Sequence, residues 1–177
     1  MPHVLVAFYS RTGTTRKVAR RIATALDADV LAITDAHPRK GVLGFMRSAI
    51  EAVRSSLPEI GPVRIDPIGY DLVVLGTPVW AGHVASPMRR YLHDHHDALP
   101  RVAFFCTMAG SNAANVFSDM SDVLGHEPIA TCAIGPKSID GDSLDQALDT
   151  FVGRLGQAVN QPPPPRGASG ESRHVGL

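Results

Sequence analysis

The residues with the clearest chemical potential form the hydroxyl-rich stretch Ser10-Arg11-Thr12-Gly13-Thr14-Thr15. It follows the apolar run Val4 to Tyr9 and precedes a helical pattern, so we expect a strand, a turn and a helix N-terminus. Unpaired N–H groups at a helix N-terminus, the helix dipole and nearby hydroxyls together favour an anion. The stretch therefore indicates a site for a phosphorylated ligand. A helix-capping turn is the alternative, because serine and threonine are common there for local reasons.

Two further segments have the composition of ligand-binding loops. Gly76-Thr77-Pro78-Val79-Trp80-Ala81-Gly82-His83 contains the only tryptophan of the chain, flanked by glycines. An aromatic plane in such a loop could cover a flat heterocycle. The second segment, Thr107-Met108-Ala109-Gly110-Ser111-Asn112, consists mainly of small residues, which let the backbone approach a ligand closely.

Positioning these segments requires an ordered set of strands and helices. Apolar runs alternate with helical patterns along the chain, which predicts βαβ units and a mostly parallel sheet. In such a sheet ligands bind beyond the carboxyl ends of the strands, where the strand order reverses, and each of the three segments follows an expected strand. Helices are expected to begin near Thr14, Val42, Ser86, Ala113 and Ser143, and strands are expected at Val4 to Tyr9, Val30 to Ile33, Asp71 to Gly76, Val102 to Cys106 and Ile129 to Ile134.

From Met1 to about Asn160 the chain resembles the flavodoxin family. The resemblance implies one three-layer α/β domain around a doubly wound, five-stranded parallel sheet of order 2-1-3-4-5. It also implies a non-covalently bound FMN at the switch point of the sheet, a placement that flavodoxins themselves exemplify. The motifs that carry the resemblance are Y-S-R-T-G-T-T at Tyr9 to Thr15, Y-D-L-V-V-L-G-T-P-V-W-A-G at Tyr70 to Gly82, and T-M-A-G-S at Thr107 to Ser111.

The same resemblance implies a role for each loop. Backbone N–H groups and hydroxyls of the first loop would hold the FMN phosphate; the family's cradle is largely neutral, which favours a solvent-facing Arg11 over an ion pair with the phosphate. A peptide near Ala81 and Gly82 would present an N–H or a carbonyl to flavin N5. The implied binding residues are Ser10, Arg11, Thr12, Gly13, Thr14 and Thr15 for the phosphate, Thr77 and Pro78 for the ribityl chain, Val79, Trp80, Ala81 and Gly82 for the ring, and Thr107, Met108, Ala109, Gly110 and Ser111 for its other edge.

Two groups of titratable residues remain as candidates. His83 follows the ring-binding loop and could hydrogen-bond the flavin or protonate a substrate, with a plain surface histidine as the alternative. The run His93-Asp94-His95-His96-Asp97 contains metal-ligand residue types, but consecutive residues point around a helix end. We therefore expect a solvated helix terminus there and no metal site.

Three other folds have a similar strand pattern, but this sequence lacks the residues that their functions require. A Walker A loop needs G-K-S/T, which is missing from the sequence. A low-molecular-weight phosphatase needs an arginine six residues after its cysteine, but Asn112 and Ser138 stand at those positions after Cys106 and Cys132. A receiver domain needs an aspartate where this chain has Gly76.

Composition restricts the broader class. With 177 residues one domain is the default, and 17 basic residues balance 17 acidic ones, which disfavours nucleic acid as a partner. Cys106 and Cys132 lie in apolar runs and suit a reducing cytosol, and no export or membrane segment is indicated at the N-terminus, so we expect a cytoplasmic protein without membrane insertion. We expect the domain to span residues 1–160 and residues 161–177, rich in proline and glycine, to form a flexible tail.

The function expected from these observations is that of an FMN-binding oxidoreductase, active in electron transfer or in NAD(P)H-linked reduction of a quinone-like acceptor. Dedicated flavodoxin shuttles are usually strongly acidic, whereas this chain is neutral. A non-enzymatic electron carrier for a separate reductase, and a flavin-free interaction domain acting through the proline-rich tail, remain as alternatives. Phe45 and Met46, in the helix expected at Val42 to Leu57, would lie near the site rim or at a homodimer contact.

Overall fold

A parallel sheet of order β2-β1-β3-β5-β6 forms the centre of the protein. The computed structural model describes residues 2–36, 56–110, 112–138 and 141–159. Its strands are β1 (Val4–Tyr9), β2 (Asp29–Ile33), β3 (Leu72–Trp80), β4 (His83–Val84), β5 (Arg101–Thr107) and β6 (Thr131–Ile134). Its helices are α1 (Thr14–Leu26), α3 (Ser86–His95), α4 (Ala113–Leu124) and α5 (Asp142–Val159), with short 3-10 turns at Pro67–Gly69 and Pro136–Ser138. The doubly wound order of five strands that the resemblance implied is therefore confirmed, with the small strand β4 added beside β3.

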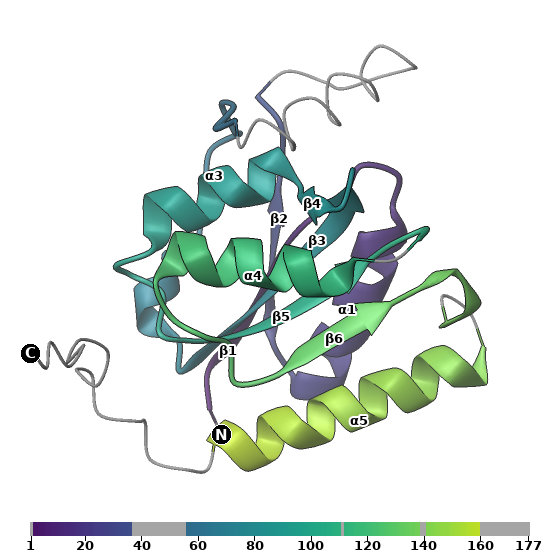
Figure 1. Ribbon diagram of the computed structural model, residues 1–177. Helices are drawn as coiled ribbons and strands as arrows, with labels where there is room; N and C mark the ends of the chain where they lie inside the picture. Colours follow the sequence, from purple (N-terminus) through teal and green to yellow (C-terminus); the bar gives the residue numbers. More distant parts are fainter. Residues whose placement is uncertain (1, 37–55, 111, 139–140, 160–177) are drawn as a thin grey trace, which may run out of the picture.

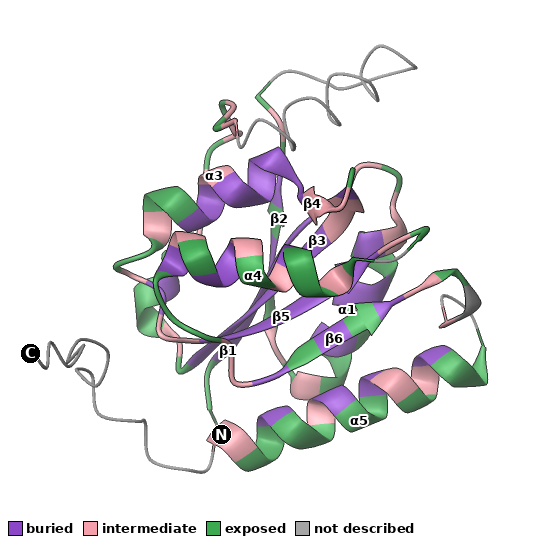
Figure 2. Cartoon of the chain, in the orientation of Figure 1, coloured by how far each residue is buried: buried purple, intermediate pink, exposed green. Residues whose placement is uncertain are grey.

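Helices cover both faces of this sheet and give three layers (Figure 1). On one face the apolar sides of α3 and α4 pack on side chains such as Leu75 and Phe104. On the other face α1 and α5 pack on side chains such as Val74 and Phe105. Because successive residues of a strand point to opposite faces, the uninterrupted apolar runs of β1, β3 and β5 supply both cores at once (Figure 2).

Strand β3 is longer than the sequence pattern indicated. Its parallel pairing with β5 continues to Pro78, which lies opposite Thr107, and the chain then turns back so that Trp80 pairs with His83 of β4. Most of the predicted loop from Gly76 to His83 is therefore strand. The turn itself consists of Ala81 and Gly82, both at positive φ (49° and 83°), the conformation that a two-residue hairpin requires.

Several sequence predictions lie outside the described residues. They are Ser111, the flexible tail at 161–177, and all of the helix expected at Val42 to Leu57 except its last two residues, which belong to no regular element. Within the described ranges no helix is long and apolar enough to cross a membrane.

Gly76 provides a test of how β3 and β5 pack. A Cβ atom at this position would overlap the ring of Phe105, its fully buried neighbour on β5. We expect Gly76→Ala to lower the free energy of unfolding by about 1–3 kcal/mol, because an overfilled core must shift side chains or backbone. Urea denaturation measures the loss. Gly69→Ala is the matched control, since its Cβ would meet no atom within 4 Å; an equal, small effect of both changes would contradict this packing.

Candidate functional site

Three loops meet at one edge of the sheet, as predicted from the parallel order (Figure 1). They follow β1, β3 and β5, whose pairing places Phe8 beside Gly76 and Gly76 beside Phe105. The carboxyl ends of these strands therefore lie together, and the switch in strand order falls between β1 and β3.

The first loop is shaped by its own backbone and by the Ser10 hydroxyl. Gly13 has a φ of 100° and its N–H donates to Ser10 Oγ at 3.1 Å, while its carbonyl accepts the first helical bond from Lys17 N at 2.9 Å. The N-cap residue of α1 is Gly13, and within the described ranges the helix has no side-chain capping hydrogen bond. The first N–H groups of an α-helix have no partner within the helix, so those of α1 point out of its end toward any ligand at the loop.

The charge at this helix end suits an anion. The first turn of α1 contains no acidic residue, and Arg16 and Lys17 are exposed there. Of the remaining predicted residues, Thr12 is exposed, whereas Arg11 and Thr14 are half-buried. Uncapped N–H groups, a positive helix end and several hydroxyls are the donor set that a phosphomonoester needs, so the loop fits such a group.

A buried pair of hydroxyls joins the first loop to the third. Thr15 Oγ1 lies 2.8 Å from Thr107 Oγ1, and the two residues are only 1% and 5% exposed. Thr107 ends β5, and Met108 N donates to the carbonyl of Ile134 at 3.0 Å. This contact fixes the start of α1 relative to the end of β5, so both loops sit on a rigid base.

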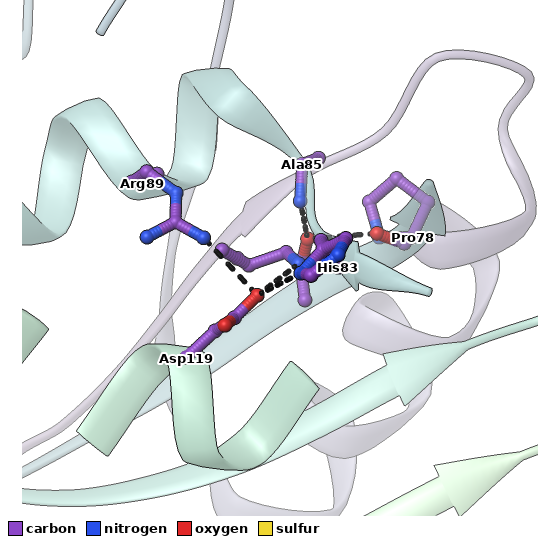
Figure 3. A network of polar contacts seen from close by, with 7 residues as sticks. Pro78, His83, Ala85, Arg89 and Asp119 are labelled. Carbon is purple, nitrogen blue, oxygen red and sulfur yellow. Dashed lines mark hydrogen bonds and ion pairs between the residues drawn. The ribbon is translucent and has the colours of Figure 1, made fainter. Parts of the chain in front are cut away.

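The β3–β4 hairpin is held by Thr77, whose buried hydroxyl accepts from Ala85 N at 3.1 Å and donates to the carbonyl of Pro78 at 3.0 Å (Figure 3). Trp80 is only 9% exposed, and its ring meets that of Tyr9 edge-on at 5.4 Å. The indole is therefore mainly a core side chain here. Pro78 and Val79 are half-buried and Ala81 is exposed, so the turn itself faces the edge of the sheet.

The third loop approaches the hairpin from the side of α4. Asn112, at a φ of 83°, precedes α4, and its side-chain amide would lie 3.2 Å from a Cβ atom at Gly82. Met108 is half-buried, and Ala109 and Gly110 are exposed. The structure thus brings the second and third predicted loops together, apart from Ser111, which is not described.

Sequence reasoning singled out His83 but missed its partners Asp119 and Arg89. Asp119 Oδ2 lies 3.0 Å from His83 Nδ1, 3.1 Å from Arg89 Nη2 and 3.3 Å from Val84 N (Figure 3). A signal was present, because Asp119 falls beside Val116 and Met120 on the buried side of α4. A charged residue at such a position requires a partner.

A cavity of about 260 Å³ lies beside the first loop, between the ends of β1 and β2. Ser10, Arg16 and Asp35 contribute polar groups to its lining, and Asp35 accepts a hydrogen bond from the Tyr9 hydroxyl at 2.7 Å. The cavity lies on the β2 side of the first loop, whereas the turn at Ala81 lies on the β3 side. The ring site implied by the resemblance does not coincide with this cavity.

At the histidine-rich end of α3 the contacts among described residues are local. His95 stacks on Tyr91 at 4.4 Å, and its Nδ1 lies 2.9 Å from the Tyr91 carbonyl. Among the described residues no group of three or more histidine, cysteine, aspartate or glutamate side chains could hold a metal ion.

Comparison with known proteins identifies the family. The flavodoxin family model matches residues 3–134. The chain belongs to the flavodoxin family. No curated protein matches this flavodoxin-family chain in sequence.

Three solved structures share the flavodoxin fold over nearly their whole length. A flavoprotein from Lactobacillus acidophilus, determined in complex with FMN, is 25% identical with a TM-score of 0.67, covering 83% of this chain and 99% of that one. A putative flavoprotein from Bacteroides eggerthii is 22% identical with a TM-score of 0.72, covering 88% and 99%. A WrbA-like flavodoxin from Agrobacterium tumefaciens is 13% identical with a TM-score of 0.58, covering 90% and 98%, and shares the fold alone.

The two cysteines of this flavodoxin-family chain are buried thiols. Burial raises the pKa of Cys106 to about 12 and that of Cys132 to about 11, so both are protonated at neutral pH. We expect a thiol reagent at pH 7 to label them only as fast as the protein unfolds. Rapid labelling of the native protein would contradict this burial.

The same shifts predict a loss of stability at high pH. Unfolded thiols ionise near their ordinary pKa of about 8.5 while the folded ones keep their protons. The contribution of the two thiols to the free energy of unfolding is therefore complete below about pH 8.5. It is lost as the pH rises through the pKa values of the folded protein. Urea denaturation at successive pH values between these limits measures the decline.

Proposed function

We propose that this chain binds FMN and acts as an oxidoreductase, with NAD(P)H as electron donor and a quinone-like molecule as acceptor. One observation carries the cofactor assignment: the uncapped N-terminus of α1, preceded by Gly13 at positive φ, at the switch point of a flavodoxin-family sheet. The FMN complex of the Lactobacillus acidophilus flavoprotein supports the same cofactor.

The residues proposed to hold FMN come from the three loops. The N–H groups of the α1 terminus and the hydroxyls from Ser10 to Thr15 would hold the phosphate. Thr77 and Pro78 would lie along the ribityl chain, and the backbone at Ala81 and Gly82 would border the ring, with Val79 and Trp80 supporting the turn from β3. The third loop, from Thr107 to Ser111, would close the other edge. When bound, FMN supplies the redox chemistry, and the chain's residues orient it and tune its potential.

An enzyme is favoured over a simple electron carrier by charge. Seventeen basic and seventeen acidic residues give no net field to steer a charged protein partner. The exposed turn and third-loop residues Ala81, Ala109 and Gly110 are small, which leaves room for a small acceptor.

The proposed function is tested on the purified full chain in two steps. The cofactor released by denaturation is identified by its absorbance and mass, with FMN as the expected result. NADPH and a soluble quinone are then added, and turnover without a further protein is expected. Bound FMN with reduction only through an added reductase would mark a carrier, and a protein that neither carries nor takes up flavin would refute the proposal.

A further inference from the structure

Three polar side chains from three elements meet directly beside the Ala81–Gly82 turn: His83 of β4, Arg89 of α3 and Asp119 of α4 (Figure 3). We propose that His83 exchanges protons with the acceptor in the flavin site through Nε2, and that Asp119 and Arg89 are its positioning residues. The proposal rests on the proposed function, because the turn would border the flavin ring.

The hydrogen bonds determine which nitrogen of His83 is available. Asp119 Oδ2 accepts from Val84 N at 3.3 Å and from Arg89 Nη2 at 3.1 Å, and His83 Nδ1 is 3.0 Å away. A carboxylate can only accept, so Nδ1 carries a hydrogen and donates it. Nε2 is then the atom that gains or loses the exchangeable proton.

The two positioning residues are more deeply buried than His83. The side chain of His83 is 37% exposed, whereas those of Asp119 and Arg89 are 21% and 10% exposed. The imidazole therefore lies at the surface beside the turn, with the carboxylate and guanidinium beneath it. A half-buried histidine oriented by a more buried aspartate is the arrangement that positions a general acid or base.

Holding the hairpin does not require the charged residues of the cluster. The neutral Thr77 hydroxyl already ties β3 to the start of α3 through Ala85 N. Arg89 is nevertheless buried, and its Nε has no hydrogen-bond partner among the described residues, which is costly. Its guanidinium donates to Asp119 Oδ2 and pairs with the charge of that carboxylate, which also accepts from His83.

Among the described residues, the ion-pair partner of His83 is Asp119. Arg90 of α3 pairs with Asp94 at 2.7 Å, and Asp122, the other acidic residue of α4, is exposed. Strand β3, with which β4 pairs, contains no titratable residue.

The proposed step is a proton transfer alone. The imidazolium of His83 gives its Nε2 proton to an oxyanion of the reduced quinone-like acceptor, so one N–H bond breaks and one O–H bond forms. The neutral imidazole keeps its Nδ1 hydrogen, which it donates to Asp119, and its Nε2 later takes a proton from solvent. No electron moves in this step.

The decisive variant is His83→Asn, because the asparagine amide can replace Nδ1–H as donor to Asp119 but cannot titrate. We expect this variant to keep its thermal midpoint and FMN affinity while turnover falls by about 100-fold and its pH profile becomes flat. His126→Asn, an exposed histidine after α4, is the control and should behave as the parent chain. An unchanged pH profile in an FMN-loaded His83→Asn protein would overturn the proposal alone, whereas failure of the parent chain to bind FMN would overturn the proposed function as well.

A second readout needs no cofactor. Nitrogen-15 NMR of the flavin-free protein should show the neutral His83 ring with its hydrogen on Nδ1 and none on Nε2. Asp119→Asn should shift the ring toward the Nε2–H tautomer. An Nε2–H tautomer in the parent chain, or no change in Asp119→Asn, would contradict the role given to Asp119.

Discussion

Replacing Gly13 by alanine is expected to weaken FMN binding by about 10- to 100-fold. Gly13 has a φ of 100°, which a residue with a Cβ atom adopts only at a cost of about 1–2 kcal/mol. Nothing lies within 4 Å of the new Cβ, so the change acts through backbone conformation rather than through a clash. If the loop relaxes to negative φ, the N–H groups before α1 turn away from the phosphate. Fluorescence titration with FMN measures the loss.

The control for Gly13 is Gly153→Ala in the middle of α5. That Cβ would also meet nothing within 4 Å, and alanine suits a helix better than glycine. We expect FMN affinity equal to that of the parent chain. Parent-like affinity in Gly13→Ala as well would contradict the phosphate cradle.

Replacing Thr15 by valine is expected to lower both stability and FMN affinity. Its hydroxyl pairs with that of Thr107 at 2.8 Å in a buried position, so the change leaves the Thr107 hydroxyl unsatisfied at a cost of about 1–3 kcal/mol. FMN affinity should fall about tenfold or more, because the same hydroxyl is a proposed phosphate donor. Thr15→Ser keeps the hydroxyl, so this variant should retain most of the stability and most of the FMN affinity of the parent chain.

The double variant Thr15→Val/Thr107→Val separates the two effects. Removing both partners of a buried pair is nearly neutral, so urea denaturation should show most of the stability recovered. FMN affinity should stay low, because the donor is still missing. A double variant that binds FMN like the parent chain would show that Thr15 only supports the structure.

The strands and the first loop could be predicted because their signals are local, whereas the sheet order followed from the resemblance to the flavodoxin family. The apolar runs of β1 and β3 and the Ser10 to Thr15 stretch each lie within a few consecutive residues. The end of β3 could not be predicted in this way. Thr77 and Pro78 have the composition of a loop, but pairing with Cys106 and Thr107 of β5 continues the strand through them.

The environment of Trp80 and the partners of His83 depend on contacts between distant residues. The hairpin folds Trp80 back against Tyr9, so a residue expected in an open loop is largely buried. Asp119 lies 36 residues after His83 and 30 after Arg89, and only the packing of α3, α4 and β4 brings them together. A charged residue on the apolar side of a helix signals that such a partner exists but does not identify it.

Comparing the affinities of FMN and riboflavin for the same flavin-free protein isolates the binding of the phosphate by the loop before α1. The two ligands differ only in the phosphate, and each charge-assisted hydrogen bond is worth about 1.5–3 kcal/mol. Fluorescence titration should therefore show FMN binding about 100-fold or more tightly than riboflavin. Equal affinities for the two ligands, or binding of neither, would show that this loop does not bind the FMN phosphate.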